Sequence, residues 1–221
     1  MPRTFVISDI HGCCKTFKKL LLETIIIKRS DKIYCVGDYV DRGKDSKGVI
    51  DLIVKLRSDG YNIHTLRGNH EQMMIDAVKD EQRLKHWLRN GGTQTLMSFG
   101  ISSINELPYL YVNFLKRTKN FIETDKYVFV HAGLNFRSAN PFKDKEAMLW
   151  TRDEYFVRSK IKNKVMIHGH TPIPLKELLK QSNPNKMNID GGCVYNYKLG
   201  YGFLIALQLP EMRVIEVRNV D

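Results

Sequence analysis

The chain has 221 residues, of which 43% are hydrophobic and 27% are charged, and its formal net charge is +11. These values are ordinary for a soluble globular protein, and no apolar run approaches the ~20 residues that a membrane-spanning helix needs. They argue against a membrane protein and a disordered chain. A chain of this length can bury one core, so we expect a single domain over residues 1–221.

The basic residues are spread along the whole chain and do not gather in an arginine-rich tail or an aromatic-interleaved patch. This spread argues against a nucleic-acid partner and favours a solvated basic surface that attracts phosphorylated substrates. The four cysteines have neither zinc-ribbon nor thioredoxin spacing, so we expect reduced thiols. Asp9 comes too early for a signal peptide, and a cytoplasmic location is therefore predicted.

The first third of the chain alternates between apolar runs and helical patterns. The predicted strands are Thr4–Ile7, Lys32–Val36 and Asn62–Leu66, and the predicted helices run roughly over Cys14–Lys28 and Ser46–Leu56. This order implies a parallel sheet with right-handed crossovers, in which ligands bind beyond the carboxyl ends of the strands. A polar motif follows each strand, so the three motifs should face one site.

The rest of the chain is predicted to be helical first and strand-rich afterwards. Residues 72–115 show helical periodicity, and a helix is predicted at Leu107–Lys116. The periodicity predicts core-facing side chains at Met73, Met74, Ala77, Val78, Leu84, Trp87 and Leu88. Later apolar runs predict two hairpins, Phe121–Thr124 with Tyr127–Val130 and Gly202–Leu207 with Met212–Val217, and a strand at Lys164–Ile167. We therefore expect an α/β fold, a two-sheet β-sandwich with helices outside.

Five predicted strands end in residue types that bind metal ions. The residues are Asp9 and His11, Asp38, Asn69, His131, and His170. Each one alone has a structural explanation, because histidines form hydrogen bonds, Asp before glycine forms turns and Asn caps helices. Five strands that all end in ligand types at one edge are improbable by chance. The pattern therefore predicts a metal centre.

The ligand types indicate two ions. Asp9 and His11 project from the same side of an extended segment and could hold one ion together with Asp38. Asn69, His131 and His170 could hold a second ion. If Asp38 bridges them, the ions lie ~3.5–4 Å apart, as in two-metal phosphoryl chemistry. Oxygen and nitrogen ligands without thiolate suit Mn, Fe or Zn, and we expect Mn.

The motif Gly37-Asp38-Tyr39-Val40-Asp41-Arg42-Gly43 places a guanidinium beside two carboxylates, which indicates a phosphate beside a metal. Together with Ser8-Asp9-Ile10-His11-Gly12 and Gly68-Asn69-His70-Glu71, it resembles the three signature motifs of the phosphoprotein phosphatase family of metallophosphoesterases. The later motifs resemble the compact bacterial and bacteriophage lambda branch; they are His131-Ala132-Gly133, Leu149-Trp150-Thr151-Arg152, Gly169-His170-Thr171-Pro172 and Ile189-Asp190-Gly191-Gly192. The resemblance thus covers nearly the whole chain.

The resemblance implies a calcineurin-like fold and a role for each motif residue. Asp38 would bridge the ions, His70 would be the general acid, and Asp41 would pair with its imidazole. Arg42 and Arg152 would bind the phosphate, and a metal-bound hydroxide would attack it. His168, which is extra relative to much of the family, is expected to support the site and not to bind an ion.

Three functions are compatible with these motifs. The first is a protein phosphatase for phosphoserine or phosphothreonine, with phosphotyrosine left open. The second is a symmetrical dinucleoside-tetraphosphate hydrolase on the same scaffold, and the third is a basic nucleic-acid-binding protein with a vestigial site. The presence of both Asp41 and Glu71 favours the first, and intact residues at every site position argue against the third. The oligomeric state is not predicted.

Overall fold

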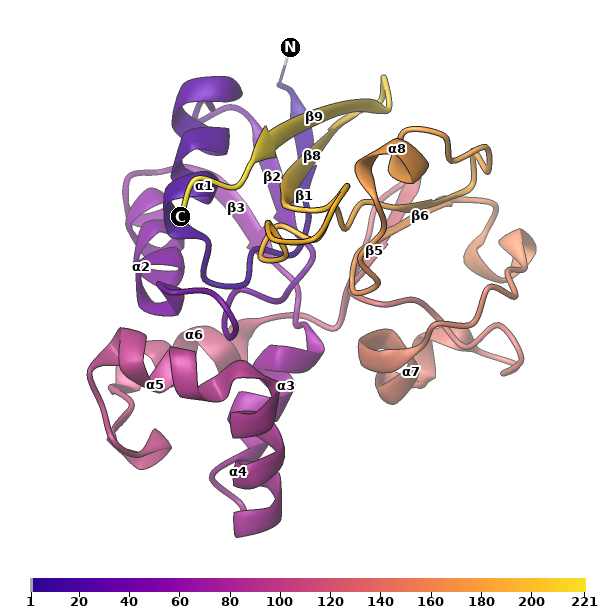
Figure 1. Cartoon of the computed structure of the whole chain (residues 1–221). Coiled ribbons are helices and arrows are strands. Elements are labelled where there is room, and N and C mark those ends of the chain that lie inside the picture. Colours follow the sequence, from indigo (N-terminus) through magenta and orange to yellow (C-terminus); the bar gives the residue numbers. More distant parts are fainter. Residues whose placement is uncertain (1) are drawn as a thin grey trace.

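The computed structural model describes residues 2–221 and contains two β-sheets with helices around them (Figure 1). The first sheet has the strand order β3-β2-β1-β8-β9 and the second has the order β4-β5-β6-β7. The strands of the first sheet are β1 (Thr4–Ile7), β2 (Lys32–Cys35), β3 (Asn62–Thr65), β8 (Phe203–Leu209) and β9 (Arg213–Arg218). Those of the second are β4 (Phe121–Glu123), β5 (Tyr127–Val130), β6 (Val165–His168) and β7 (Lys186–Asn188).

The first three strands end at the same level. They are parallel, and their register pairs Ile7 with Cys35 and Cys35 with Thr65. The three loops that follow therefore leave one edge of the sheet side by side. Because the connections run through α1 (Cys14–Lys19) and α2 (Ser46–Ser58), these helices cover one face of the sheet (Figure 1). The prediction of a parallel sheet is confirmed for these strands, while β8 adds to β1 in the antiparallel sense.

The second sheet sends two more loops toward the same region. Its strands β5 and β6 are parallel, with Phe129 opposite Ile167, and the chain continues from them into His131 and His170. The predicted hairpins are present, as β4 with β5 and as β8 with β9. Both sheets thus contribute loops to one site.

The two sheets pack face to face around an apolar layer. This layer contains side chains from both sheets, including Val6, Val36 and Ile205 from the first and Phe129 and Ile167 from the second, all of them buried. A larger core lies between the first sheet and its helices, where Phe17, Leu20, Val49, Ile50 and Ile53 are buried. Because successive side chains of a strand point to opposite faces of the sheet, the strands of the first sheet contribute side chains to both layers. The expected α/β sandwich with outer helices is confirmed.

A separate group of helices lies below the strand ends (Figure 1). It comprises α3 (Asn69–Asp76), α4 (Glu81–Trp87), η2 (Leu88–Gly92), α5 (Thr93–Phe99), η3 (Ile104–Glu106) and α6 (Tyr109–Arg117). The shorter elements η4 (Pro141–Lys143), α7 (Lys145–Trp150), η5 (Arg158–Ile161) and α8 (Leu175–Leu178) lie in the second half. A turn at residues 77–80, which the periodicity did not predict, separates α3 from α4.

Two predictions from helical periodicity were wrong in detail. Val78 was expected in the core, but it is 56% exposed, because α3 ends at Asp76 and Val78 lies in the turn before α4. The first helix was expected to reach Lys28, but it changes to a π-helix at Leu20–Thr24 and ends there. Within residues 2–221, no helix is long and apolar enough to cross a membrane.

Candidate metal centre

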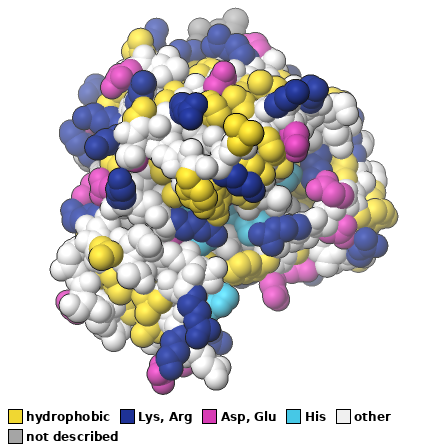
Figure 2. Space-filling view, in the orientation of Figure 1, with side chains coloured by type: hydrophobic (Ala, Val, Ile, Leu, Met, Phe, Trp, Pro, Cys, Tyr) yellow, Lys and Arg dark blue, Asp and Glu magenta, His cyan; other side chains and the backbone are white. Residues whose placement is uncertain are grey.

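The five loops at the strand ends bring their histidines to the floor of one hollow. In Figure 2 histidine side chains are visible in this hollow, and Lys and Arg side chains lie around its rim. Two groups of ligand-type atoms meet here, each with its members within 4.8 Å of one another: His11, Asp38 and His70, and Asp38, His131 and His170. Asp38 belongs to both groups. The structure therefore brings residues from three sequence motifs and two later loops to one point.

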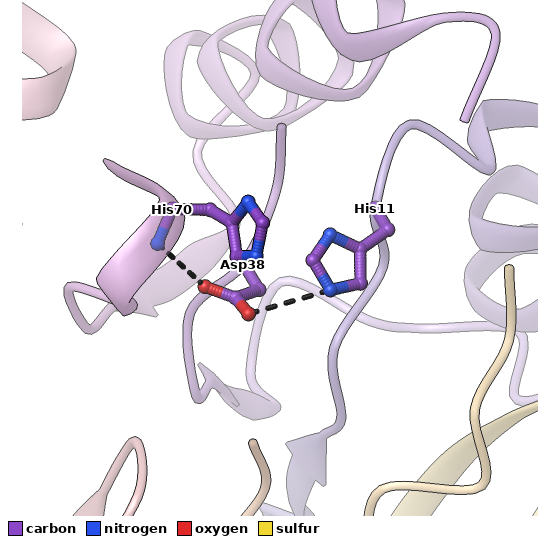
Figure 3. Close-up of side chains that lie close together, drawn as sticks. All are labelled: His11, Asp38 and His70. Carbon is purple, nitrogen blue, oxygen red and sulfur yellow. Dashed lines mark hydrogen bonds and ion pairs between the residues drawn. The ribbon is translucent and has the colours of Figure 1, made fainter. Parts of the chain in front are cut away.

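Asp38 lies between the two groups and directs one carboxylate oxygen at each. Its Oδ2 is 3.3 Å from His11 Nε2 (Figure 3), and its Oδ1 is 3.5 Å from His131 Nε2. The backbone N–H of His70 donates to Oδ1 at 3.2 Å, which holds the carboxylate in this orientation. A carboxylate with one oxygen toward each ligand group has the arrangement that a bridge between two cations requires.

Asn69 joins the second group. Its Oδ1 lies 2.9 Å from His131 Nε2 and 3.1 Å from His170 Nδ1, so three ligand atoms face one another. His131 Nδ1 lies 3.0 Å from the carbonyl oxygen of Val36, which orients the ring. A histidine whose second nitrogen bonds a backbone carbonyl is the usual form of a metal-binding histidine.

Asp9 lies beside these groups and is not within either of them. The backbone N–H of His170 donates to its Oδ2 at 3.0 Å, while its Oδ1 is buried and has no hydrogen-bond partner within residues 2–221. A buried carboxylate oxygen without a partner is costly, which indicates that a cation completes its surroundings. Asp9 is therefore still compatible with the predicted ligand role.

Asp190 adds a carboxylate that the ligand pattern did not predict. Burial, together with the charges of Asp190 and Asp38, raises the pKa of Asp9 well above its usual range. Burial likewise raises the pKa of Asp38 and of Asp190 to about 7. In the sequence, Asp190 was noted only as part of the motif Ile189-Asp190-Gly191-Gly192, and no role at the site was predicted for it. Three buried carboxylates that destabilise one another fit a site built around positive charge.

The pKa values of the histidines are shifted in the opposite direction. Burial lowers the pKa of His131 to about 3 and that of His170 to about 2, and it lowers the pKa of His11 well below its usual range. Neutral imidazoles are the form that binds metal ions. Buried carboxylates and neutral histidines, with one amide oxygen among them, fit a pair of divalent cations such as Mn, Fe or Zn.

Close approach between loops explains several motif glycines. A Cβ on Gly37, whose φ is +113°, would lie 2.6 Å from the backbone nitrogen of Gly68 and 2.9 Å from His131 Nδ1. A Cβ on Gly68 would collide with Asp38 Oδ1, and one on Gly169 with Asp9 Oδ1. These positions therefore need glycine because the ligands themselves occupy the space a side chain would take.

The backbone of the site residues is strained. Non-glycine residues with positive φ include His11 (46°), Asp38 (52°), Asp41 (70°), Arg42 (69°) and His170 (70°). Such conformations are sparsely populated for residues with a Cβ and persist where the surrounding structure holds them. They lie in three of the five loops, where contacts with the rest of the structure outweigh the local backbone preference and set the direction of these side chains.

Glu71 links the second and third motifs. Its Oε2 accepts the backbone N–H groups of Asp38 and Gly68, both at 2.8 Å, and its Oε1 accepts that of Tyr39 at 2.8 Å. Burial raises the pKa of Glu71 to about 8, and these N–H donors oppose that shift. Burial and the charge of Asp38 favour the protonated form, whereas the backbone N–H donors on both oxygens favour the ionised carboxylate. Glu71 thus has a structural role that its sequence position did not reveal.

Asp41 and His70 form a buried pair with further support. His70 Nδ1 lies 2.7 Å from Asp41 Oδ2, and both side chains are almost fully buried. Trp87 Nε1 donates to both oxygens of Asp41 at 3.0 Å, and Thr95 Oγ1 donates to Oδ1 at 2.6 Å. Trp87 was predicted only as a core residue, because its indole N–H leaves no trace in a hydrophobic pattern.

Arg42 reaches the metal groups, while Arg152 lies at the surface. Arg42 Nη1 is 2.8 Å from His11 Nε2, and its guanidinium stacks 5.7 Å from the centre of the Tyr195 ring. Arg152 is exposed, and its positive charge contributes to the lowered pKa of His170. His168 belongs to neither ligand group; its Nδ1 lies 3.1 Å from the carbonyl oxygen of Gly169.

Comparison with known proteins agrees with this geometry. Residues 2–201 match the family described as Calcineurin-like phosphoesterase. The chain is 42% identical over 88 residues to serine/threonine-protein phosphatase 1 of Salmonella typhimurium, covering 40% of this chain and 38% of that protein. It is 31% identical over 136 residues to the symmetrical bis(5'-nucleosyl)-tetraphosphatase of Wigglesworthia glossinidia brevipalpis, covering 59% of this chain and 44% of that protein. Each match spans less than half of the relative.

A solved structure shows the same fold. The structure of a protein serine/threonine phosphatase from Saccharomyces cerevisiae has a TM-score of 0.70 at 15% identity, covering 100% of this chain and 81% of that chain. The two-sheet fold with paired Asp and His groups at the strand ends is that of a metallophosphoesterase. The chain belongs to the calcineurin-like phosphoesterase family.

Glu71→Gln tests the link between the motifs. An amide would present N–H donors to backbone N–H donors, and at least one buried N–H would lose its acceptor. We expect the free energy of unfolding, measured by urea denaturation of metal-free protein, to fall by roughly 2 kcal/mol or more. Glu81→Gln, at an exposed ion pair with Lys85, is the control and should cost under about 0.5 kcal/mol. Equal urea midpoints for Glu71→Gln and the unaltered protein would contradict the proposed link.

Proposed function

We propose that the protein is a metal-dependent phosphomonoesterase that removes phosphate from phosphoserine and phosphothreonine in proteins. The observation that carries the proposal is the meeting of Arg42 with the Asp38-centred ligand groups, since its Nη1 lies 2.8 Å from His11 Nε2. A guanidinium next to two cation sites can bind the oxygens of a phosphate that also contacts the ions.

The ligands divide between two ions. Asp9, His11 and Asp38 would hold the first, and Asp38, Asn69, His131 and His170 the second, with manganese as the proposed ion. When bound, the ions supply a water of lowered pKa and withdraw charge from the phosphate. The chain's own contribution is to keep the imidazoles neutral by burial and to aim the two oxygens of Asp38 in different directions.

His70 is proposed to protonate the leaving oxygen, with Asp41 as its positioning partner. The contact at 2.7 Å orients the imidazole by its Nδ1, and Nε2 would then be the nitrogen that donates to the leaving oxygen. Burial lowers the pKa of His70 and raises that of Asp41, and the negative charge of Asp41 would oppose this effect by stabilising the protonated ring. Trp87 and Thr95 hold Asp41 in place, so the acid would be kept at a fixed angle to the bound phosphate.

A dinucleoside-tetraphosphate hydrolase is the second candidate, because the chain has relatives named for that activity. The complete Val40-Asp41-Arg42-Gly43 run and Glu71 favour the protein phosphatase. The deciding experiment is a measurement of kcat/KM for phosphoserine peptides and diadenosine tetraphosphate with Mn present. A higher kcat/KM for the peptides is expected; a clear preference for diadenosine tetraphosphate would overturn the proposal in favour of the second candidate.

Metal removal should abolish activity. Chelation followed by desalting should leave no measurable phosphatase activity, and Mn should restore it better than other divalent ions. Asp38→Asn should be the most damaging ligand substitution, because the bridging carboxylate would contact both ions. Metal content by elemental analysis and activity on p-nitrophenyl phosphate measure both effects. Full activity in rigorously metal-free protein would refute the two-metal assignment.

Arg152→Ala should weaken substrate binding without loss of metal. The guanidinium is proposed to contact the phosphate and not the ions, and one charged hydrogen bond is worth ~1.5–3 kcal/mol. We therefore expect KM to rise roughly tenfold or more while elemental analysis still finds two ions per chain. Loss of metal from this variant would show that Arg152 supports the ligand loops instead.

His70→Asn should have an effect that depends on the leaving group. A serine alkoxide needs a proton to leave, whereas p-nitrophenolate leaves readily without one. General acid catalysis contributes ~10²–10⁴-fold, so kcat should fall in that range for a phosphoserine peptide and distinctly less for p-nitrophenyl phosphate. Equal losses on both substrates, with chemistry shown to be rate-limiting, would mean that His70 orients the phosphate and is not the acid.

A further inference from the structure

A cleft of about 520 Å³ lies next to the metal centre. One wall is the turn through η2 and the start of α5, and the other is the loop that follows Gly192. Its polar and aromatic lining comes from Arg42, Arg89, Asn90, Gln94, Tyr195 and Tyr197. Arg42 belongs to both the cleft and the metal centre, so a substrate whose phosphate contacts Arg42 reaches the cleft directly.

Contacts with Arg42 and Trp87 hold the η2 segment in place. The backbone N–H of Arg42 donates to the carbonyl oxygen of Gly91 at 3.3 Å, and a Cβ on Gly91 would lie 2.6 Å from that nitrogen. Gly92 packs against the fully buried ring of Trp87. The turn therefore cannot move away from Arg42 without breaking these contacts, and the backbone that carries Arg89 is held close to Arg42.

The cleft carries positive charge without compensation. Among residues 2–221, two guanidiniums line it and no carboxylate does. Arg89 is exposed and forms no ion pair within residues 2–221, whereas Arg83 and Lys85 on the preceding helix pair with Asp80 and Glu81. The basic side chains of this segment thus divide into paired ones on the outer surface and an unpaired one in the cleft.

We propose that the cleft is a subsite for a second anionic group of the substrate, the carboxylate of an acidic residue near the phosphorylated residue of a phosphopeptide. This inference rests on the proposed protein-phosphatase function. Arg89 would bind the carboxylate, while Arg42, stacked on Tyr195, keeps its guanidinium for the phosphate. A cleft of about 520 Å³ beside Arg42 has room for only a short stretch of peptide, so the acidic residue would be close in sequence to the phosphorylated one.

Matched phosphoserine peptides test the proposal. One set carries Glu at the flanking positions and the other carries Gln, and the readout is the ratio of their kcat/KM values. For the unaltered protein we expect the acidic peptide to be preferred about three- to tenfold, mainly through KM. Arg89→Gln should bring the ratio near one, and Arg89→Glu should bring it below one. Lys85→Gln, an exposed basic residue outside the cleft, is the control and should keep the ratio of the unaltered protein.

The outcomes separate this proposal from the proposed function. Equal turnover of both peptides by the unaltered protein, or the same ratio in Arg89→Gln, would overturn the subsite and leave the phosphatase intact. Turnover of p-nitrophenyl phosphate with neither peptide hydrolysed would overturn the protein-phosphatase function, and the peptide subsite with it. If diadenosine tetraphosphate is preferred and Arg89→Gln selectively reduces its turnover, the cleft binds further phosphates and the peptide assignment is wrong. Melting temperatures of all variants check that folding is retained.

Discussion

The site depends on one buried carboxylate that holds two loops together by their backbone N–H groups. Glu71 lies at the start of α3 and accepts hydrogen bonds from Asp38 and Tyr39 in the loop after β2 and from Gly68 in the loop after β3. The parallel register brings these loops to the same edge of the sheet, but it does not determine their distance. The carboxylate does so, because its two oxygens can satisfy donors from both loops at once. The position of Asp38, and with it the meeting point of the two ligand groups, follows from this contact.

Buried charges and strained backbone conformations, both of which are energetically unfavourable, are concentrated around this link. Asp9, Asp38 and Asp190 are all buried, the charges of Asp190 and Asp38 raise the pKa of Asp9, and five site residues have positive φ. Such features persist only where the surrounding packing is strong enough to hold them. The two apolar layers on either side of the first sheet provide that packing. Cations would remove the electrostatic part of the cost, so metal binding and stability of the loops are expected to be coupled.

The helical segment that contains α4 and α5 serves both the chemistry and the recognition of substrate. On its inner side Trp87 and Thr95 hold Asp41, and through it His70. On its outer side Arg89 and Gln94 line the cleft beside Arg42. The same packing of Gly92 on Trp87 therefore positions the proposed acid and the proposed subsite together. Members of the family with a different segment here could keep the metal centre while accepting different substrates.

The sequence by itself determined the strands and the residues at their ends. Apolar runs bounded by glycine predict strands well, and parallel strands bring their carboxyl ends to one edge, so residues from Asp9 to His170 could be assigned to one site. Helical periodicity was less reliable, as Val78 shows, because it cannot locate the turns that interrupt a helix. Only the tertiary structure decided that Asp190 lies near Asp9, that Glu71 joins two loops and that Trp87 bonds Asp41. These contacts join residues far apart in the chain or use backbone donors, and neither kind produces a local pattern in the sequence.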